Sequence, residues 1–221
     1  MTKTVIFVLS AAILSAAPEA PKRLEAAAAA FKEVMGIPDK AIPQDLMAKA
    51  HCIVLVPDLK KGAFIVGAKY GKGFFSCRNK SGAGWSAPAS IRVEGGSFGF
   101  QIGGTETDVF MLVMNERGVD RLLTTKFTLG ADATAAAEPV GRSTQAETDA
   151  AMTAEILTWS RSRGLFAGVS LSGATLREDG DWNIELYGKK LTNKEIVTSG
   201  VKAPAAAASL LAELNRYSSR K

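Results

Sequence analysis

Short apolar runs separated by glycine, proline and polar residues dominate the chain from residue 52 onward. Six of them follow one another up to residue 115: CIVLVP, GAFIVGAKYG, KGFFSCR, WSAPASIRV, GSFGFQIGG and TDVFMLVMN. Runs of this length, bounded by turn-forming residues, are typical of β-strands. The pattern therefore predicts six strands joined by tight turns.

Helical spacing marks both ends of the chain. Residues 23–35 place apolar side chains three and four positions apart, and Gly36 and Pro38 end the run. This segment lacks the basic face of a membrane-surface helix, so packing against the protein's own sheet is the favoured role. Further helices are predicted over 43–50, 115–127, 191–200 (with Thr192 or Asn193 near its start) and 204–221.

The remaining runs, 130–142, 152–163, 164–176 and 181–189, have strand-like patterns. Strands that follow one another through short turns favour antiparallel pairing. We expect an α+β fold: a mainly antiparallel, glycine-rich sheet that could curl toward a barrel, flanked by N- and C-terminal helices.

The N-terminus has the layout of a secretory signal peptide. Lys3 precedes an apolar stretch from Val5 to Leu14, and small residues follow before Pro18. The stretch is short for a membrane span, although an uncleaved anchor is the alternative. The expected organisation is a signal peptide over residues 1–20 and one domain over 21–221. The mature chain would be exported, periplasmic or secreted, without a transmembrane span and peripherally associated with membrane.

Two cysteines, Cys52 and Cys77, and one histidine, His51, limit the chemistry. An oxidising compartment would permit one disulfide, and two buried free thiols are the alternative. This set is too small for a four-ligand Cys/His zinc site, and the sequence predicts neither a metal nor a cofactor.

Charge points to anionic partners. Lysine and arginine number 27 against 22 aspartates and glutamates, and the sequence pI is about 9.2. A basic surface attracts lipid headgroups or nucleic acid without specificity. No block of like charges resembles a nucleic-acid tail, so no nucleic-acid partner is expected.

Motifs for catalysis are incomplete. GAKYGKG at 67–73 lacks the spacing and the terminal Ser or Thr of a phosphate-binding loop. Gly168, Ser170 and Gly173 are one residue too widely spaced for a nucleophile elbow. A hydrolytic serine also needs a base, and His51 lies at a helix–strand junction. A hydrolase is therefore the least favoured hypothesis.

Five long motifs occur in a fixed order. They are the run at 50–73, GWSAPASI at 84–91, GGSFGFQIGGTETDVFMLVM at 95–114, FTLGADATAAAEPVGR at 127–142 and SRSRGLFAGVSLSGA at 160–174. Together they resemble the SYLF domain family, whose members bind lipid and are also described as actin-binding in yeast relatives. The resemblance implies a non-catalytic protein that binds anionic phospholipid, including phosphoinositides in eukaryotic relatives. The actin role is not transferred.

Basic turn residues with aromatic neighbours are the candidate lipid-binding residues that follow from this resemblance. They are Lys60, Lys61, Lys69, Lys72, Arg78, Trp85, Arg161, Arg163 and Phe166. Lysine and arginine near an anionic surface contribute about 1 kcal/mol each, and aromatic side chains settle at headgroup level. The alternative for each residue is a solvated turn or a packed core position. The alternative for the protein is a cell-envelope module that binds another protein or a glycan.

Overall fold

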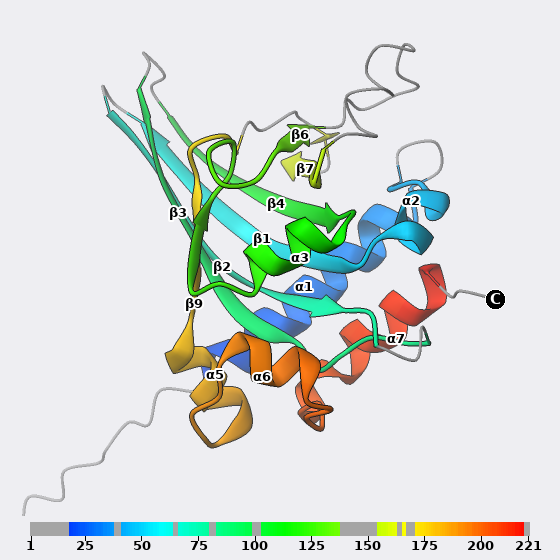
Figure 1. Cartoon of the computed structure of the whole chain (residues 1–221). Coiled ribbons are helices and arrows are strands. Elements are labelled where there is room, and N and C mark those ends of the chain that lie inside the picture. Colours follow the sequence, from blue (N-terminus) through cyan, green and yellow to red (C-terminus); the bar gives the residue numbers. More distant parts are fainter. Residues whose placement is uncertain are drawn as a thin grey trace, which may run out of the picture.

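The computed structural model describes residues 18–37, 41–63, 66–79, 83–98, 103–137, 154–162, 165–166 and 171–218. One sheet forms the centre, and helices cover part of each of its faces (Figure 1). The predicted signal peptide lies outside these residues except for its last three positions. The boundary at residue 20 falls inside the first helix, where Ala20 is fully buried.

Four long strands carry the sheet: β1 (Cys52–Ala63), β2 (Val66–Cys77), β3 (Ala89–Phe98) and β4 (Gly103–Val113). Shorter strands complete it: β5 (Lys126–Thr128), β6 (Ala135–Ala137), β7 (Ile156–Ser162), β8 (Leu165–Phe166) and β9 (Thr175–Glu178). The order is β5-β9-β3-β2-β1-β4-β7-β6, and β8 also pairs with β7. Every pairing is antiparallel except that of β6 with β7. The predicted α+β class is confirmed, and the sheet is open rather than closed into a barrel.

The six runs predicted between 52 and 115 form four strands, because β2 continues across Gly71 and the run 96–104 is divided between β3 and β4. Strand β1 continues past Pro57 through a bulge. Its register shifts between Leu55 and Lys60, where Asp58 has a φ of 49°. The backbone of β1 here approaches β2 so closely that a Cβ on Gly73 would lie 2.1 Å from the Leu55 carbonyl oxygen. Glycine therefore lets β2 run straight past the bulge instead of breaking there.

Seven helical segments surround the sheet in the described part of the chain. They are α1 (Glu19–Met35), α2 (Gln44–Lys49), α3 (Glu116–Leu122), α5 (Gly180–Tyr187), α6 (Asn193–Thr198), the 3₁₀ turn η1 (Ala205–Ala207) and α7 (Ala208–Tyr217). Helix α6 begins with the expected Thr192 cap, a capping box completed by Glu195. The helix predicted over 115–127 ends at Leu122, and residues 126–128 form β5 instead.

Two strand predictions were wrong. Residues 181–189 form most of α5, because the Asp179 carboxylate accepts a hydrogen bond from the Trp182 amide and caps a helix. The second, over the run 164–176, was wrong only in part. Residues 165–166 form β8 and residues 175–176 begin β9, whereas residues 171–174 form a turn; residues 164 and 167–170 lie outside the described part of the chain. The Ala174 amide donates to the Leu171 carbonyl, and Gly173 has a φ of 77°. The alternation of apolar and polar residues does not reveal these local hydrogen bonds.

The two faces of the sheet pack against different helices. One face contacts α1, α5 and α7 through a core that includes Phe31, Phe74 and Leu210. The other contacts α3 and α6 through Phe75, Leu122 and Ile196. The apolar stripe predicted for residues 23–35 is the buried side of α1. At one end the strands β1 to β4 extend together beyond all the helices (Figure 1).

None of the described helices is long and apolar enough to cross a membrane.

Candidate functional site

The paired strands β1 and β2 present different chemistry at their two ends. At one end Cys52 pairs with Cys77, and at the other Lys61 pairs with Lys69. Cys77 and Lys69 are eight residues apart on β2, so they project from the same face, about 25 Å apart. We call residues Lys60, Lys61, Lys69 and Tyr70 the lysine end, and the surroundings of the Cys52–Cys77 bond the disulfide end.

Two lysines directly oppose each other at the lysine end. Lys61 and Lys69 are cross-strand partners, and the next positions in the same row are Thr105 on β4 and Gly95 on β3, neither of which is charged. Directly opposed like charges destabilise a sheet. Lys69 is buried, and this burial together with the Lys61 charge lowers the pKa of the Lys69 ammonium. The fold thus places two lysines opposite each other, one of them in a buried position.

The opposite face of the lysine end carries Lys60 and Tyr70, which also pair across the strands. The Lys60 ammonium lies 3.7 Å from a Glu106 carboxylate oxygen, and both side chains are largely exposed. Tyr70 is 48% exposed, the most exposed large hydrophobic residue among those described. A cation and an accessible aromatic ring therefore lie side by side on this face.

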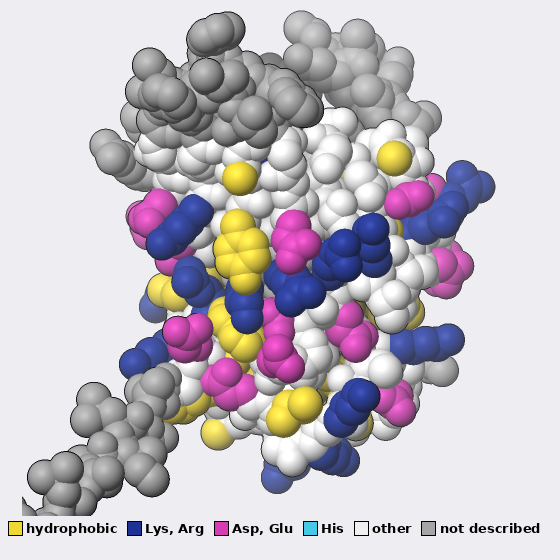
Figure 2. Space-filling view, turned by 90° about the vertical axis from the view of Figure 1, so that its left-hand side faces the viewer, with side chains coloured by type: hydrophobic (Ala, Val, Ile, Leu, Met, Phe, Trp, Pro, Cys, Tyr) yellow, Lys and Arg dark blue, Asp and Glu magenta, His cyan; other side chains and the backbone are white. Residues whose placement is uncertain are grey.

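Nearer the helices, charges are balanced within the sheet. Glu94 lies 2.9 Å from the Arg92 guanidinium and 3.2 Å from that of Arg177. Figure 2 shows the same mixture over the surface, with lysine and arginine side chains interspersed among carboxylates. This region has no excess of one sign comparable with the Lys61–Lys69 pair.

Arg161, one of the predicted lipid-binding residues, lies inside the protein. Its side chain is buried, forms an ion pair with Glu33 of α1 and lies 2.7 Å from an Asp108 oxygen of β4. Burial acts to lower the pKa of Arg161, but the hydrogen bonds and charges of the two carboxylates outweigh it and raise the pKa. Arg161 therefore connects α1 to the sheet.

Lys72 also binds within the protein. Its ammonium lies 2.9 Å from the buried Asp179 and 4.4 Å from the centre of the Trp182 ring. Since Asp179 also caps α5, the Lys72 side chain is held at the start of this helix.

Arg78 and Trp85 form a third internal contact. The Arg78 guanidinium stacks over the indole at 4.1 Å and donates to the main-chain oxygens of Met47 and Ser218. The buried Trp85 donates its indole N–H to the Ser218 hydroxyl. Both residues fix the last helix against the sheet.

Two remaining candidates are described little or not at all. Arg163 lies outside the described residues. Phe166 belongs to β8, where its backbone pairs with that of Arg161. Of the predicted residues that the structure describes, Lys60, Lys61 and Lys69 lie together at the end of β1 and β2 that extends beyond the described helices.

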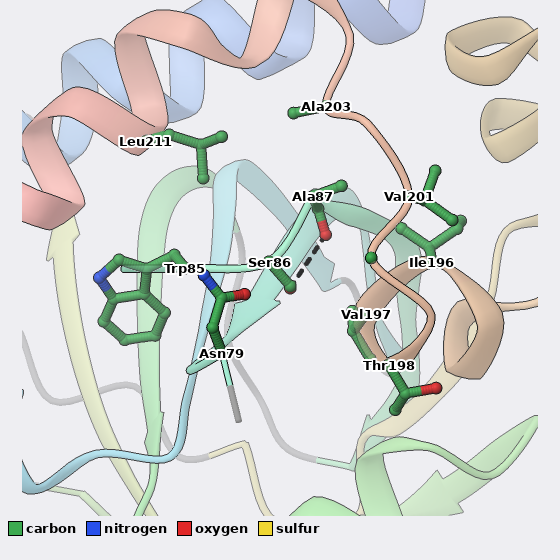
Figure 3. Close-up of a pocket in the computed structure, with 11 residues that line it drawn as sticks. Asn79, Trp85, Ser86, Ala87, Ile196, Val197, Thr198, Val201, Ala203 and Leu211 are labelled. Carbon is green, nitrogen blue, oxygen red and sulfur yellow. Dashed lines mark hydrogen bonds between the residues drawn. The ribbon is translucent and has the colours of Figure 1, made fainter. Parts of the chain in front are cut away.

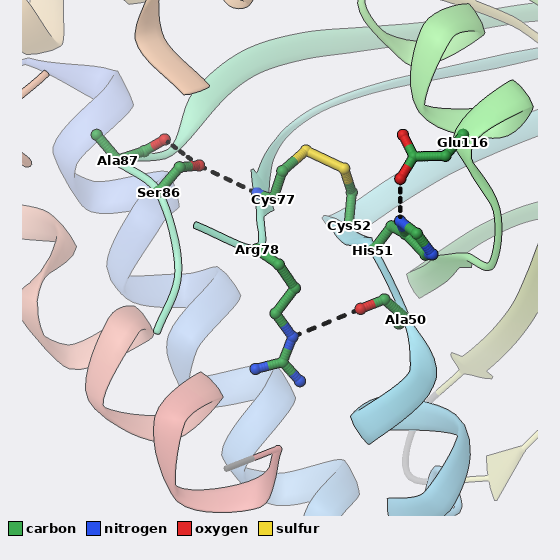
Figure 4. The surroundings of a disulfide bond; sticks show 8 residues. All are labelled: Ala50, His51, Cys52, Cys77, Arg78, Ser86, Ala87 and Glu116. Carbon is green, nitrogen blue, oxygen red and sulfur yellow. Dashed lines mark hydrogen bonds and ion pairs between the residues drawn. A yellow bond between two sulfur atoms is a disulfide. The ribbon is translucent and has the colours of Figure 1, made fainter. Parts of the chain in front are cut away.

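The disulfide end is compact. Cys52 and Cys77 are bonded, and the Ser86 hydroxyl accepts a hydrogen bond from the Cys77 amide (Figure 4). His51 places its Nδ1 3.1 Å from the Glu116 carboxylate. Among the described residues no cluster of histidine, cysteine or carboxylate side chains could hold a metal ion.

Comparison with known proteins assigns the chain to a family. The family described as "Ysc84: Las17-binding protein actin regulator" matches residues 94–217, more than half of the chain. The chain belongs to this family, the Ysc84 or SYLF family. The predicted resemblance is therefore confirmed, and the family description names a regulator rather than an enzyme.

Relatives in animals and yeast extend the SYLF match toward the N-terminus. The SH3 domain-containing YSC84-like protein 1 is 34% identical in Rattus norvegicus and 33% in Homo sapiens over 184 residues, which cover 83% of this chain. Protein YSC84 of Saccharomyces cerevisiae is 34% identical over 177 residues, 78% of this chain. The chain spans 54%, 53% and 37% of these three relatives.

The sequence of this SYLF chain did not reveal which basic residues form ion pairs inside the protein. Glu33 is more than a hundred residues from Arg161 in the sequence, and Asp179 is also more than a hundred residues from Lys72. Tyr70 was not among the predicted lipid-binding residues, although it follows Lys69 on a strand with alternating faces. Its neighbour Lys69 is buried on one face, so alternation would have placed Tyr70 on the other.

Proposed function

We propose that this SYLF-family protein binds anionic phospholipid without catalysis, and that the lysine end contacts the headgroup phosphates. The observation that supports the proposal is the direct opposition of Lys61 and Lys69. A phosphate oxygen beside the two ammonium groups would accept charge-assisted hydrogen bonds from both and offset their mutual repulsion.

The position of the lysine end suits a membrane surface. The strands that carry it extend beyond the described helices (Figure 1), and there Lys60 is exposed and Lys61 partly exposed. Lys60 and the half-exposed Tyr70 on the other face add a cation and an interfacial ring. Lysines near an anionic leaflet contribute about 1 kcal/mol each, which favours a headgroup array over a single soluble phosphate.

Phosphoinositide-type headgroups are the finer proposal, as the resemblance to eukaryotic lipid-binding relatives implies. Export to the periplasm or exterior remains a proposal as well. Because Ala20 is buried and its amide donates to Glu185, cleavage would have to precede Pro18 to leave α1 intact.

The family description supports a second candidate, regulation of actin through a protein partner. An envelope module that binds a protein or glycan is a further alternative. Neither requires the opposed lysines, so the response of binding to these two residues distinguishes them from the lipid proposal.

Liposome flotation tests the proposal. The wild-type protein should float with phosphatidylglycerol vesicles at low salt and not with phosphatidylcholine vesicles. The Lys61→Gln/Lys69→Gln variant should bind roughly thirtyfold more weakly, from about 1 kcal/mol for each lysine. Lys190→Gln, an exposed lysine that follows α5, is the matched control. Equal binding of both vesicle types, or undiminished binding of the double variant, would refute the proposal.

Arg161 is unsuitable for this test. Its replacement would leave Glu33 and Asp108 without their shared cation, and a loss of binding could then reflect unfolding.

A further inference from the structure

Two cavities meet at the disulfide end. The first, of about 430 Å³, is lined by residues of the loop before β3, of α6 and of the segment that leads into α7, with both apolar and polar groups at its surface. The second, of about 410 Å³, lies beside the Cys52–Cys77 bond. Both are lined by Asn79, Val197 and Thr198, so they adjoin at these residues. We call them the tryptophan cavity and the disulfide cavity.

Apolar side chains face each other across the tryptophan cavity. Trp85 and Leu211 lie on one side, and Ile196 and Val197 of α6 lie on the other, with Asn79 between them (Figure 3). The Ser86 hydroxyl in its wall already donates to the Ala87 carbonyl and accepts from the Cys77 amide. A cavity of this size and lining suits an aliphatic chain of several carbons.

Acidic groups border the disulfide cavity. Glu116 and Asp120 lie one turn apart on α3, line the cavity on the same helix face and are exposed. The basic side chains opposite are those of His51, which contacts Glu116, and Arg78. The Arg78 guanidinium is directed to Trp85 and to two main-chain oxygens. The accessible charge of this cavity is therefore negative.

We infer that the joined cavities bind a small aliphatic ammonium compound. Its carbon chain occupies the tryptophan cavity, and its ammonium group lies beside Glu116 and Asp120. The apolar lining alone would accept any alkyl chain, so the carboxylates set the sign of the polar group. The Asn79 amide and the Thr198 hydroxyl, where the cavities meet, offer hydrogen-bond partners to the carbon next to the ammonium if it carries a polar substituent. This site is at the opposite end of β1 and β2 from the lysine end and does not depend on the lipid proposal.

Hexylammonium chloride is the probe, and NMR spectra of the full chain provide the readout. Hexylammonium should shift the indole N–H signal of Trp85 and the amides of Val197 and Thr198, with a dissociation constant of about 1 mM. The indoles of Trp159 and Trp182 are internal controls, because neither lines the two cavities. Hexanoate, with the same chain and the opposite charge, should bind at least about tenfold more weakly.

Variants at exposed positions test the two halves of the site without disturbing the core. Glu116→Gln/Asp120→Asn should weaken hexylammonium binding about fivefold to tenfold, whereas Asp181→Asn on α5 should leave it unchanged. Thr198→Lys places a cation where the cavities meet and should abolish the shifts.

Three outcomes overturn the inference: no shift at Trp85, equal binding of hexanoate, or an unchanged affinity in the Glu116→Gln/Asp120→Asn variant. The tripeptide acetyl-Leu-Lys-Leu-amide distinguishes a protein segment from a small amine. If it binds more than tenfold more tightly than hexylammonium and shifts the same signals, the occupant is a lysine-bearing peptide, and the small-amine assignment is wrong.

Discussion

The two ends of the β1–β2 pair differ in the side chains that face each other across the strands. At the disulfide end a covalent bond joins Cys52 to Cys77, and apolar side chains surround it. At the lysine end the paired residues are two lysines, Lys61 and Lys69. One end is thus joined covalently, and the other places two basic side chains next to each other. Such a division is expected where a binding site is built at a cost in stability.

The largest expected effect is on the disulfide end. Replacing both cysteines, Cys52→Ala/Cys77→Ala, should lower the free energy of unfolding by about 3.5 kcal/mol, from the loop entropy of a 25-residue separation. Urea denaturation measures this loss. Binding to anionic vesicles should remain unchanged below the new transition, and a parallel loss of binding would show that the two ends are not independent.

Arg161 tests the distinction between an internal cation and a surface one. Arg161→Met should destabilise the protein by about 3 kcal/mol, because Asp108 and Glu33 lose their shared partner in a partly buried site. Thermal unfolding followed by circular dichroism checks this value. If the variant is as stable as wild type but floats poorly with anionic vesicles, Arg161 contacts lipid and this interpretation is wrong.

The lysine end should respond in the opposite direction. Lys69→Gln removes one of two opposed charges from a buried position and should raise the free energy of unfolding by about 1 kcal/mol at neutral pH, while weakening vesicle binding. Lys190→Gln is again the control for the loss of one positive charge. A destabilised Lys69→Gln variant would mean that the lysine pair supports the fold.

A smaller effect is the pH dependence of that gain. The folded state lowers the pKa of Lys69, so its penalty is complete below the folded pKa and disappears as the pH rises toward the ordinary lysine value. The stability difference between Lys69→Gln and wild type should therefore shrink as the pH is raised through the alkaline range. Urea unfolding at a series of alkaline pH values measures it, and a constant difference would show that the benefit does not come from charge.

The sequence revealed the periodic features of this fold because they depend on neighbouring residues. The buried stripe of α1 and the Thr192 cap of α6 follow from local spacing and are present as expected. The strand predicted over 181–189 failed because the Asp179 cap is a hydrogen bond that hydropathy does not encode. Likewise, Pro57 and the glycines of β2 suggested strand ends, whereas the bulge of β1 is accommodated by Gly73.

The candidate site shows the same limit. All three lysines of the lysine end were identified from composition near predicted turns, but so were Lys72, Arg78 and Arg161. Only the register of the sheet separates them, since Lys72 and Arg161 meet carboxylates from distant segments whereas Lys61 meets another lysine. Pairing between distant strands and helices is the information that a single sequence lacks.

The titration of the Lys69 ammonium tests the central claim most directly. Its side-chain nitrogen signal, followed by NMR in the intact protein, should give a pKa below the ordinary lysine value in the free state. Saturating short-chain phosphatidylglycerol should raise that pKa toward or above the ordinary value, because an anion at the pair favours the charged form. An unchanged Lys69 pKa in the lipid-bound protein would contradict the account.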